Sequence, residues 1–453
     1  MITVTEFQGE RVAVFGLGRS GLSAIRALIA GGAEVLAGDD RAGNLGEAAR
    51  LGAKTADLPD TDWRGIKALV LSPGVPLTHP QPHPVVRAAA AAGVEILCDV
   101  PLMAAAVRTK GPQIVGITGT NGKSTTTALL GHLLRHADRA VQIGGNIGTP
   151  TLDLKPLEDD GTYVIEMSSY QLDLARGMAF DVAALLNLSP DHLDRHGDMD
   201  GYVAAKRHIF DGQDAACSAV IAIDDRLTAA IFDDLTEHGA QRLIPVSTHG
   251  PVERGVFVAD SALHDALDND AIRITSLSGI DSLAGSHNRQ NAATAYAIAR
   301  ALGLTAGEAA SGLASYPGLA HRMEPITTQR GVRFINDSKA TNAIAAAQAL
   351  SAFERIHWIA GGHGKNKDFG ALIPWLDHIV CAYLIGETAE HLAAELDIPT
   401  VLCGTLDRAV AKAAETAARG EVVLLSPACA SFDQFASFEA RGERFRQLVE
   451  ALS

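Results

Sequence analysis

Ten residues, Gly116 to Thr125, place glycines beside a lysine and two hydroxyl residues in the order Gly-Ile-Thr-Gly-Thr-Asn-Gly-Lys-Ser-Thr. Glycine lets backbone N–H groups approach a phosphate, lysine supplies positive charge, and a serine or threonine hydroxyl can ligate Mg²⁺. A strand-like run over 113–117 precedes the turn, and a helical pattern over 124–134 follows it, so the helix N-terminus would face the anion. The run predicts a site for a nucleoside triphosphate.

This loop departs from the strict P-loop spacing, because Ile117 stands where the first glycine would fall. A glycine-rich turn alone is often only structural, but Lys-Ser-Thr at the start of a helix favours phosphate binding. Either Ser124 or Thr125 could ligate Mg²⁺, and Ser124 is our candidate. The expected ATP-binding residues of the loop are Gly119, Thr120, Asn121, Gly122, Lys123, Ser124 and Thr125.

A carboxylate ends the next strand-like run, 163–166. Glu166 is a candidate Mg²⁺ ligand, since Mg²⁺ takes one or two protein carboxylates together with phosphate oxygens. Alone, a glutamate at a strand end is usually a solvated residue, and only its pairing with the phosphate loop favours the metal.

A second polar segment, 187–197, follows the strand-like run that begins at Val182. We expect His192 to help hold a second Mg²⁺ while Asp191 and Asp194 order the loop; the alternative is a helix cap with surface charges. Lys206 follows on a predicted helix, where a lysine by itself would usually be a surface residue.

The first hundred residues open with a strand over 11–15, a glycine-rich turn over 16–21, a helix to Ala30 and a second strand ending before Asp39-Asp40. This order is a dinucleotide-type βαβ unit, with acidic residues where a ribose or base would lie. A further strand, 68–71, runs into the turn Ser72-Pro73-Gly74-Val75. Ligands collect at such carboxyl ends of strands.

The last part of the chain repeats the alternation, with strands expected near 333–335, 357–360, 383–385 and 422–425. Polar loops follow at 336–342, 361–365 and 426–435, and such loops gather at one edge of a parallel sheet. Lys365 is a natural partner for a carboxylate, although a lone lysine is usually solvated. Asp337 or Ser338 could instead be a plain helix cap.

Length and periodicity predict an α/β protein of three domains: a Rossmann-like domain over 1–101, a central mononucleotide-binding sheet of P-loop type over 102–317, and a Rossmann-like domain over 318–453. A small β excursion is expected between 252 and 280. Short linkers between the domains suggest closure on ligand binding.

Composition argues against several classes of protein. The net charge of −15 argues against nucleic acid, because an acidic body repels phosphate backbones. The first residues do not resemble a signal peptide, and no run of about eighteen apolar residues occurs, so we expect a soluble, cytoplasmic protein without membrane insertion. Five scattered cysteines without paired metal spacing argue against disulfides and a structural zinc.

Together these motifs resemble the Mur ligase family over essentially the whole chain. The segments that carry the resemblance are GITGTNGKST, Gly144 to Gly148, Glu166 to Leu172, Asn187 to Gly197, Gly285 to Asn288, His321-Arg322, Asn336 to Asn342 and Leu425 to Phe438. In this order they are specific, although several are modest individually.

The resemblance implies ATP-dependent amide formation, through an acyl phosphate, between UDP-N-acetylmuramoyl-L-alanine and D-glutamate in peptidoglycan synthesis. It also implies two Mg²⁺ sites and a carbamylated lysine at Lys206, and we expect a monomer. A free lysine titrates near about 10.4, so the site must favour the neutral or carbamylated amine.

Site residues implied by the resemblance fall into five groups. Lys123, Glu166, His192 and Lys206 would be catalytic, and Ser124, Glu166, His192 and Lys206 would surround the metals. Asn291, Arg322 and Asp337 would contact ATP. Lys339, Thr341, Lys365, Ser431 and Phe438 would recognise D-glutamate. Leu17, Arg19, Ser20, Asp39, Asp40, Gly74 and Asn146 would lie along the UDP-sugar. His363 departs from the acidic residue expected after the paired glycines, which affects the contacts around Lys365.

Four alternatives compete with this interpretation. Two belong to the same superfamily: a ligase for another amino acid, and a folylpolyglutamate synthetase, whose chains begin at the phosphate-loop domain and lack the glycine-loop domain expected here. A nicotinamide-dependent dehydrogenase built on Gly16 to Gly21 leaves the phosphate loop unexplained. A non-catalytic nucleotide-binding module would bind ATP without releasing phosphate.

Overall fold

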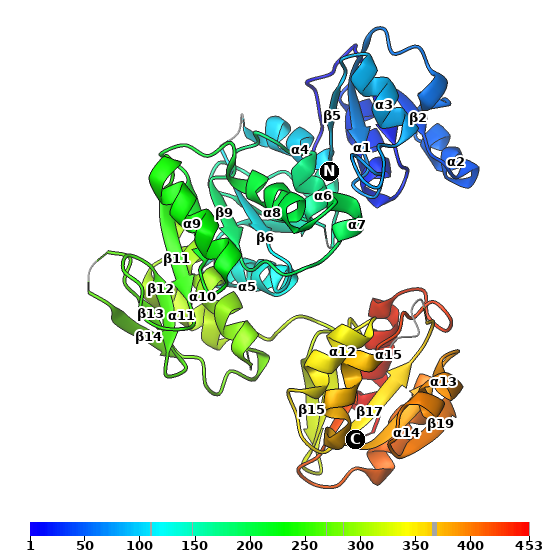
Figure 1. The fold of residues 1–453 in the computed structure, drawn as a ribbon, viewed down its shortest axis with the longest axis vertical. Helices are drawn as coiled ribbons and strands as arrows, with labels where there is room; N and C mark the ends of the chain where they lie inside the picture. Colours follow the sequence, from blue (N-terminus) through cyan, green and yellow to red (C-terminus); the bar gives the residue numbers. More distant parts are fainter. Residues whose placement is uncertain (109–110, 147, 269, 284, 365–368, 453) are drawn as a thin grey trace. The chain divides into compact units, whose positions relative to one another are not determined.

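The computed structural model describes residues 1–453 except 109–110, 147, 269, 284, 365–368 and 453. The chain forms two compact units, one of residues 1–279 and 286–316 and the other of residues 280–285 and 317–453. The first unit contains two sheets and the second contains one. Figure 1 shows the elements in chain order by colour.

The first sheet is parallel throughout and has the order β3-β2-β1-β4-β5. Its strands are β1 (Arg11–Phe15), β2 (Glu34–Gly38), β3 (Lys54–Thr55), β4 (Ile66–Leu71) and β5 (Glu95–Leu97), and its helices are α1 (Arg19–Ala30), α2 (Ala42–Arg50) and α3 (Pro84–Ala91). The order reverses between β1 and β4, which is where ligands bind in open α/β sheets. The loops after these two strands touch, because Ser72 donates its N–H to the carbonyl of Phe15 at 2.9 Å. The predicted βαβ opening is confirmed.

The central sheet has nine strands in the order β14-β13-β12-β11-β10-β9-β6-β8-β7. The strands are β6 (Gln113–Thr118), β7 (Val141–Gly145), β8 (Thr162–Glu166), β9 (Val182–Leu185), β10 (Ser218–Ala222), β11 (Arg242–Ser247), β12 (Val256–Ala259), β13 (Ala262–Asp265) and β14 (Ile272–Ser276). Strands β7 to β12 pair in parallel, whereas β12, β13 and β14 pair antiparallel, which confirms the predicted β excursion.

Helices connect the strands of this central sheet (Figure 1). They are α4 (Asp99–Arg108), α5 (Lys123–His136), α6 (Ser169–Asp173), α7 (Leu193–His196), α8 (Met199–Arg207), α9 (Arg226–His238), α10 (Ser286–Ala301) and α11 (Ala306–Ala314). Strand β6 lies between β8 and β9 and is buried along almost its whole length. The phosphate loop begins at the carboxyl end of β6, so it lies between the carboxyl ends of β8 and β9.

The second unit has one sheet, in the order β15-β16-β20-β17-β18-β19, with only β15 antiparallel to its neighbour. Its elements are β15 (Glu324–Gln329), β16 (Val332–Asn336), α12 (Ala343–Leu350), β17 (Ile356–Gly361), β18 (Ile379–Ile385), α13 (Ala389–Glu395), β19 (Thr400–Gly404), α14 (Leu406–Thr416), β20 (Val422–Leu425) and α15 (Phe438–Glu450). Short 3₁₀ segments lie at Leu58–Asp60, Thr151–Asp153, His208–Phe210, Asp281–Leu283 and Gly370–His378.

Side chains of this sheet alternate between two cores. Val422 and Leu424 pack with α12 and α13, whereas Val423 and Leu425 pack with α14 and α15. Because successive strand residues point to opposite faces, a run of four apolar residues requires helices on both sides. The sheet is therefore doubly wound, as predicted.

Two features of the second unit differ from the sequence analysis. Strands β15 and β19 were not anticipated, because their residues are only partly buried and lack a strong apolar run. The alternative that Asp337 or Ser338 caps a helix is wrong, since α12 begins at Ala343 and Asn342 caps it by accepting the N–H of Ala345 at 2.9 Å.

No helix in the described part of the chain has the length and hydropathy needed to cross a bilayer.

A buried polar network ties the strands of the second unit together. The carboxylate of Glu421 accepts hydrogen bonds from His357 at 2.7 Å and from the N–H of Ala418 at 2.8 Å, and it pairs with Arg355. His357 in turn contacts the hydroxyl of Tyr383 at 3.0 Å. Burial opposes ionisation of Glu421, but these hydrogen bonds outweigh it and lower the pKa to about 2.

Glu421→Gln should lower the free energy of unfolding of the second unit by about 3 kcal/mol at pH 7, because a carboxylate with a depressed pKa stabilises the fold. A carboxyl pKa lowered from 4.5 to about 2 gives a stabilisation that is complete above about pH 5 and is lost as the pH falls toward 2. The difference between the two proteins should therefore shrink over that interval.

The measurement is urea unfolding followed by tryptophan fluorescence in a Trp63→Phe background, which leaves Trp358 and Trp375 of the second unit as reporters. A difference that stays constant from pH 7 to pH 2.5 would contradict the assigned role of Glu421.

Candidate functional site

The phosphate loop needs glycine at two positions. Gly119 has φ +152° and Gly122 has φ +84°, both outside the range that other residues favour. A Cβ at Gly122 would lie 2.2 Å from Oδ1 of Asn291, and a Cβ at Gly119 would lie 2.8 Å from Cβ of Leu186. Gly122 is also the N-cap of α5, so the backbone turns directly into the helix N-terminus. The loop is shaped as an anion cradle.

Backbone hydrogen bonds hold this loop against the end of β9. Thr120 donates its N–H to the carbonyl of Asn187 at 2.8 Å, and Asn121 donates its N–H to the Asn187 side chain at 2.8 Å. Asn187 returns a hydrogen bond to the Asn121 carbonyl at 3.1 Å. Ser124 and Thr125, in the first turn of α5, are both buried. The predicted loop residues therefore form one connected structure.

Two lysine ammonium groups meet at the loop. Lys123 donates to the carbonyls of Gly119 and Thr120, each at 2.8 Å. Lys206, from α8, donates to the same Gly119 carbonyl at 2.9 Å and to Oγ1 of Thr118 at 3.3 Å. The surface role that a lone helical lysine usually has does not hold here, because Lys206 is only 1% exposed.

Burial and the positive charge of Lys123 lower the pKa of Lys206 well below its ordinary value, and the opposing attractions of Asp191 and Glu166 are smaller. The phenol ring of Tyr202, one turn earlier on α8, lies 4.9 Å from the Lys206 nitrogen and contacts Thr120 through its hydroxyl at 3.1 Å. A lysine in this setting has an increased share of neutral amine, which is a nucleophile.

Glu166 is buried at the carboxyl end of β8, and one of its carboxylate oxygens is satisfied by the protein. Oε1 accepts a hydrogen bond from Asn146 at 2.9 Å, and the Asn146 N–H bonds to the Glu166 carbonyl at 2.9 Å. Oε2 is buried and has no hydrogen-bond partner among the residues that the structure describes. A buried carboxylate oxygen left in this way fits a cation.

His192 is the N-cap residue of α7 and has φ +52°, a conformation uncommon for histidine. Its imidazole is half-exposed and lies 3.5 Å from Asp191. Over the described residues, no group of three or more His, Cys, Asp or Glu side chains is arranged to hold a metal ion by itself. Mg²⁺ commonly completes its shell with water and phosphate oxygens, so this donor set is compatible with it.

A cavity of about 330 Å³ lies in the first unit, between the ends of β1 and β4 and the segments around Asn146 and Ser168. Arg19, Ser20, Gly74 and Asn146, all predicted for the UDP-sugar, line it. Arg19 also donates to the carbonyl of Gly148. Four of the seven residues predicted for this ligand are therefore brought together.

The other three, Leu17, Asp39 and Asp40, are not among the residues that line this cavity. Asp39 accepts the N–H groups of Leu17 at 2.6 Å and Arg41 at 2.8 Å. Burial works against ionisation of Asp39, but these hydrogen bonds outweigh it and lower its pKa. Asp40 is exposed and pairs with His83 at 3.2 Å. Asp39 thus orders the glycine turn.

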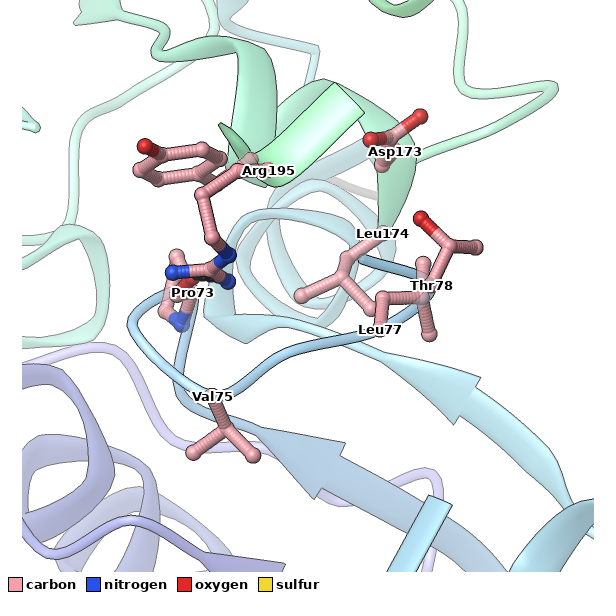
Figure 2. Close-up of a pocket in the computed structure, with 8 residues that line it drawn as sticks. Pro73, Val75, Leu77, Thr78, Asp173, Leu174 and Arg195 are labelled. Atoms are coloured by element: carbon pink, nitrogen blue, oxygen red, sulfur yellow. Dashed lines mark hydrogen bonds between the residues drawn. The ribbon is translucent and has the colours of Figure 1, made fainter. Parts of the chain in front are cut away.

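A much smaller cavity lies beside the loop that follows β4, and Pro73, Val75, Tyr170, Asp173 and Arg195 are among its lining residues (Figure 2). It marks where the N-terminal sheet meets α6 and α7 of the central domain.

In the second unit, the carboxyl end of β16 carries Asp337. Its carboxylate accepts hydrogen bonds from the Ser426 hydroxyl at 2.8 Å and the Met323 N–H at 3.1 Å. Burial raises the pKa of Asp337 to about 7, against the effects of these hydrogen bonds and of Arg322 and Lys339. Asp337 can therefore hold or release a proton near neutral pH.

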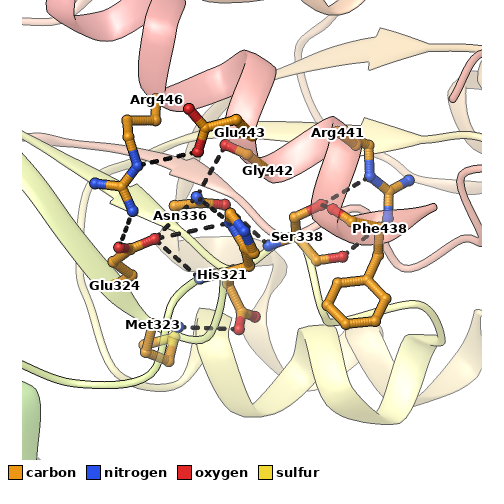
Figure 3. Close-up of polar contacts among 11 residues, drawn as sticks. His321, Met323, Glu324, Asn336, Ser338, Phe438, Arg441, Gly442, Glu443 and Arg446 are labelled. Atoms are coloured by element: carbon orange, nitrogen blue, oxygen red, sulfur yellow. Dashed lines mark hydrogen bonds and ion pairs between the residues drawn. The ribbon is translucent and has the colours of Figure 1, made fainter. Parts of the chain in front are cut away.

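Arg441 of α15 joins the ends of β16 and β20 (Figure 3). Its guanidinium donates to the hydroxyl and carbonyl of Ser338 at 3.0 and 2.9 Å, to the Cys429 carbonyl at 3.1 Å from two nitrogens, and to the Ala430 carbonyl at 3.4 Å. It is 1% exposed, and burial lowers its pKa to about 10. Ser338 also donates to the Phe438 carbonyl at 2.8 Å.

The hydrogen bonds of Arg441 connect the segments that carry the predicted D-glutamate residues. Ser431 is buried just after Ala430, Lys339 and Thr341 follow Ser338, and Phe438 begins α15. Lys365 lies outside the described residues. Among the predicted ATP residues, Asn291 belongs to the first unit, with the phosphate loop, while Arg322 and Asp337 belong to the second.

Three family models match successive parts of the chain. Residues 10–98 match the family described as Mur ligase MurD-like, N-terminal domain; residues 117–299 match Mur ligase middle domain; and residues 321–429 match Mur ligase, glutamate ligase domain. A Caulobacter sp. (strain K31) protein named UDP-N-acetylmuramoylalanine--D-glutamate ligase is 50% identical over 461 residues, covering 100% of this chain and 98% of its own. The chain belongs to the Mur ligase family. A Rhizobium meliloti (strain 1021) protein of the same name is 48% identical, with the same coverage.

Solved Mur ligases share the fold. The UDP-N-acetylmuramate-alanine ligase MurC of Thermotoga maritima has a TM-score of 0.59 at 14% identity, covering 98% of this chain and 100% of its own. The MurF ligase of Thermotoga maritima, solved in complex with ADP, has a TM-score of 0.55 at 19% identity, covering 100% and 98%. At these identities the likeness shows the three-domain Mur ligase architecture alone, and it confirms the predicted fold class.

Sequence reasoning missed Arg441 and the role of Asn187 in tethering the phosphate loop. Arg441 lies in a helix with several other arginines, and nothing local separates it from the more exposed Arg444. Asn187 could have been found, because an amide directly after a strand beside a glycine loop is well placed to bind backbone groups.

Gly122→Ala should destabilise the protein by about 3 kcal/mol, from the left-handed backbone and the overlap with Asn291, and should abolish nucleotide binding. Gly307→Ala is the matched control, since Gly307 lies in α11 with a helical backbone and nothing within 4 Å of the added Cβ. It should be neutral or slightly stabilising. Thermal unfolding and calorimetric titration with ATP measure both effects; equal ATP affinity in the two variants would contradict the assigned geometry.

Proposed function

We propose that this Mur ligase joins D-glutamate to UDP-N-acetylmuramoyl-L-alanine with the energy of ATP, in the synthesis of peptidoglycan precursors. The observation that carries the proposal is the meeting of Lys123, the buried Lys206 and the open oxygen of Glu166 at a phosphate loop. Full-length relatives at 48–50% identity bear the name of this activity, which supports the choice of substrates.

The phosphate loop would position the γ-phosphoryl group of ATP. Backbone N–H groups between Gly119 and Gly122, the N-terminus of α5 and the Lys123 ammonium would face the phosphates. Lys123 would exchange its hydrogen bonds to two loop carbonyls for hydrogen bonds to phosphate oxygens. Catalysis of phosphoryl transfer is mainly such positioning and charge stabilisation.

Two Mg²⁺ ions fit the donors at this edge of the sheet. Ser124 and the unpartnered oxygen of Glu166 would hold them, together with His192 and Lys206 in its carbamylated form. When bound, Mg²⁺ would neutralise negative charge on the transferring phosphoryl group. Asn146 would orient Glu166 through Oε1 and leave Oε2 for the cation.

Lys206 is suited to carbamylation. Its neutral amine would attack CO₂, forming an N–C bond and releasing a proton to solvent, and the product is an anion in place of a cation. A carbamate would relieve the repulsion between Lys206 and Lys123, because an anion next to Lys123 is attracted to it.

The reaction that this arrangement supports has two steps. The L-alanyl carboxylate would attack the γ-phosphorus, giving an acyl phosphate and ADP. The amine of D-glutamate would then attack the acyl carbon, form the amide bond, lose a proton and release inorganic phosphate. Thr120 and Tyr202 would order the loop that receives the phosphates.

Binding roles follow the domain division 1–101, 102–317 and 318–453, which we propose as the boundaries. Arg19, Ser20, Gly74 and Asn146 would contact the UDP-substrate in the 330 Å³ cavity, with Leu17, Asp39 and Asp40 as the outer part of its path. Asn291, Arg322 and Asp337 would contact ATP. Lys339, Thr341, Lys365, Ser431 and Phe438 would bind D-glutamate. We place the enzyme in the cytoplasm as a monomer.

A Mur-type ligase for another amino acid is the second candidate, since the phosphate site is compatible with any acceptor amine. A folylpolyglutamate synthetase is less well supported, because the FolC structure of E. coli resembles 79% of this chain at 21% identity, a likeness of fold alone.

The test is phosphate release from ATP with Mg²⁺ and UDP-N-acetylmuramoyl-L-alanine, comparing D-glutamate with L-glutamate, D-aspartate, lysine and no amine. Release that depends on D-glutamate is expected. Release with a different amine would keep the ligase chemistry and replace the substrate, and no release with any amine would contradict the proposal.

Lys123→Ala tests the role of the phosphate loop in the same assay. It should reduce phosphate release by at least about a hundredfold, the scale of losing a charge that stabilises the transition state. It should leave binding of the UDP-substrate unchanged, because Lys123 is not among the residues lining that cavity.

A further inference from the structure

Arg195 spans the boundary between the two sheets of the first unit. It belongs to α7, which follows β9 of the central sheet, and its Nη1 donates to the carbonyl of Gly74 at 3.1 Å. A longer hydrogen bond, of 3.5 Å, joins Nη2 to the carbonyl of Pro73. Figure 2 shows the side chain extending from α7 to this loop, which follows β4 of the N-terminal sheet.

The same guanidinium contacts the aromatic group around His192. Its central carbon lies 4.6 Å from the ring centroid of Tyr170, a cation–π distance. The Tyr170 ring lies 5.1 Å from the ring of His192 and stacks on His196 at 5.5 Å. Arg195 therefore contacts the Pro73–Gly74 loop directly. Through the ring of Tyr170 it is also linked to His192, the proposed metal ligand.

A second contact shows how closely these segments approach. Gly197 ends α7 with φ +87°, and a Cβ there would lie 3.0 Å from Nε2 of His79, in the same loop as Gly74. The loop also packs on the glycine turn after β1, where a Cβ at Gly16 would lie 2.5 Å from Cβ of Ser72. The loop that contains Pro73 and Gly74 thus packs against α7 and against the glycine turn after β1. Arg195 provides the hydrogen bonds of the contact with α7.

The hydrogen bond from Arg195 fixes the orientation of the Pro73–Gly74 peptide. The Pro73 carbonyl and the Gly74 N–H belong to one planar trans peptide, so they point to opposite sides. When the carbonyl faces Arg195, the N–H faces away from it, and Gly74 is one of the residues that line the 330 Å³ cavity. The neighbouring Val75 N–H is already bonded to the Ser72 carbonyl at 2.9 Å.

Packing alone does not account for this arrangement. Nε of Arg195 is buried and has no hydrogen-bond partner among the described residues. A buried N–H without a partner costs roughly 1–3 kcal/mol, so the arginine is present here at a cost to stability.

We propose that Arg195 is a positioning residue that fixes the Pro73–Gly74 peptide, turns the Gly74 N–H toward the anionic part of the UDP-substrate, and couples this loop to Tyr170 and His192. The proposal rests on the proposed function for the identity of the substrate. Arg195 itself need not touch the substrate or the reacting atoms.

Steady-state kinetics of Arg195→Ala and Arg195→Lys test this role. In Arg195→Ala the KM for the UDP-substrate should rise about tenfold, while kcat stays within about threefold and the KM for ATP within about twofold, the pattern of lost uniform binding. Arg195→Lys should behave similarly, because an ammonium lacks the planar fork that reaches two carbonyls and stacks on a ring.

Arg176→Ala is the matched control. Arg176 is a mostly exposed arginine just after α6 that pairs with Asp173 at 3.5 Å, and among the described residues it has no hydrogen bond or ion pair with the loop that follows β4. It should leave every constant unchanged. Millimolar guanidinium chloride should lower the raised KM of Arg195→Ala, whereas equal NaCl should not, a rescue that a purely structural defect would not show.

Direct calorimetric titration with UDP-N-acetylmuramoyl-L-alanine separates this proposal from the proposed function. About tenfold weaker binding by both Arg195 variants supports the positioning role, and wild-type affinity in either variant overturns it. So does an equal loss of kcat and of affinity for all three substrates. Absence of D-glutamate-dependent turnover in the wild type, with intact binding of the UDP-substrate, counts against the proposed function alone.

Discussion

Burial of the Lys206 amine beside Lys123 is the interaction on which the rest of the candidate site depends. Two lysines share the carbonyl of Gly119, and one of them is almost completely withdrawn from water. Such a pair destabilises the charged state of the inner lysine, which lowers its pKa. Strained, unfavourable arrangements of this kind persist where function requires them. Oε2 of Glu166 is a second unfavourable feature of the same site, because it is buried and has no hydrogen-bond partner among the described residues.

The fold meets this requirement by placing strand ends. Strand β6 delivers the phosphate loop, β8 delivers Glu166 and β9 delivers Asn187, which anchors the loop. These three strands are adjacent and parallel, so their carboxyl ends meet at one edge. The N-terminal sheet contributes its own switch point, and Arg195 links that loop to the central domain. In the second unit, Arg441 performs a similar task for the ends of β16 and β20.

Much of this could be predicted from the sequence. Strands β1 and β20 begin and end where the apolar runs do, and the glycine loop, Glu166 and the β excursion lie where expected. What could not be predicted depends on which way a helix faces. Lys206 and Arg441 sit in ordinary helical patterns, and their burial follows from tertiary packing that a local pattern does not contain. Asp39 shows the reverse: its place after β2 was correct, but backbone N–H groups of the glycine turn already use its carboxylate.

Carbamylation of Lys206 is tested most directly by carbon-13 NMR of the protein equilibrated with ¹³C-bicarbonate, with Lys206→Ala as reference. We expect a carbamate resonance in the wild type that is absent from the variant and whose intensity follows ligase activity as bicarbonate is removed and restored. Full activity in a protein that shows no carbamate resonance at saturating bicarbonate would contradict it.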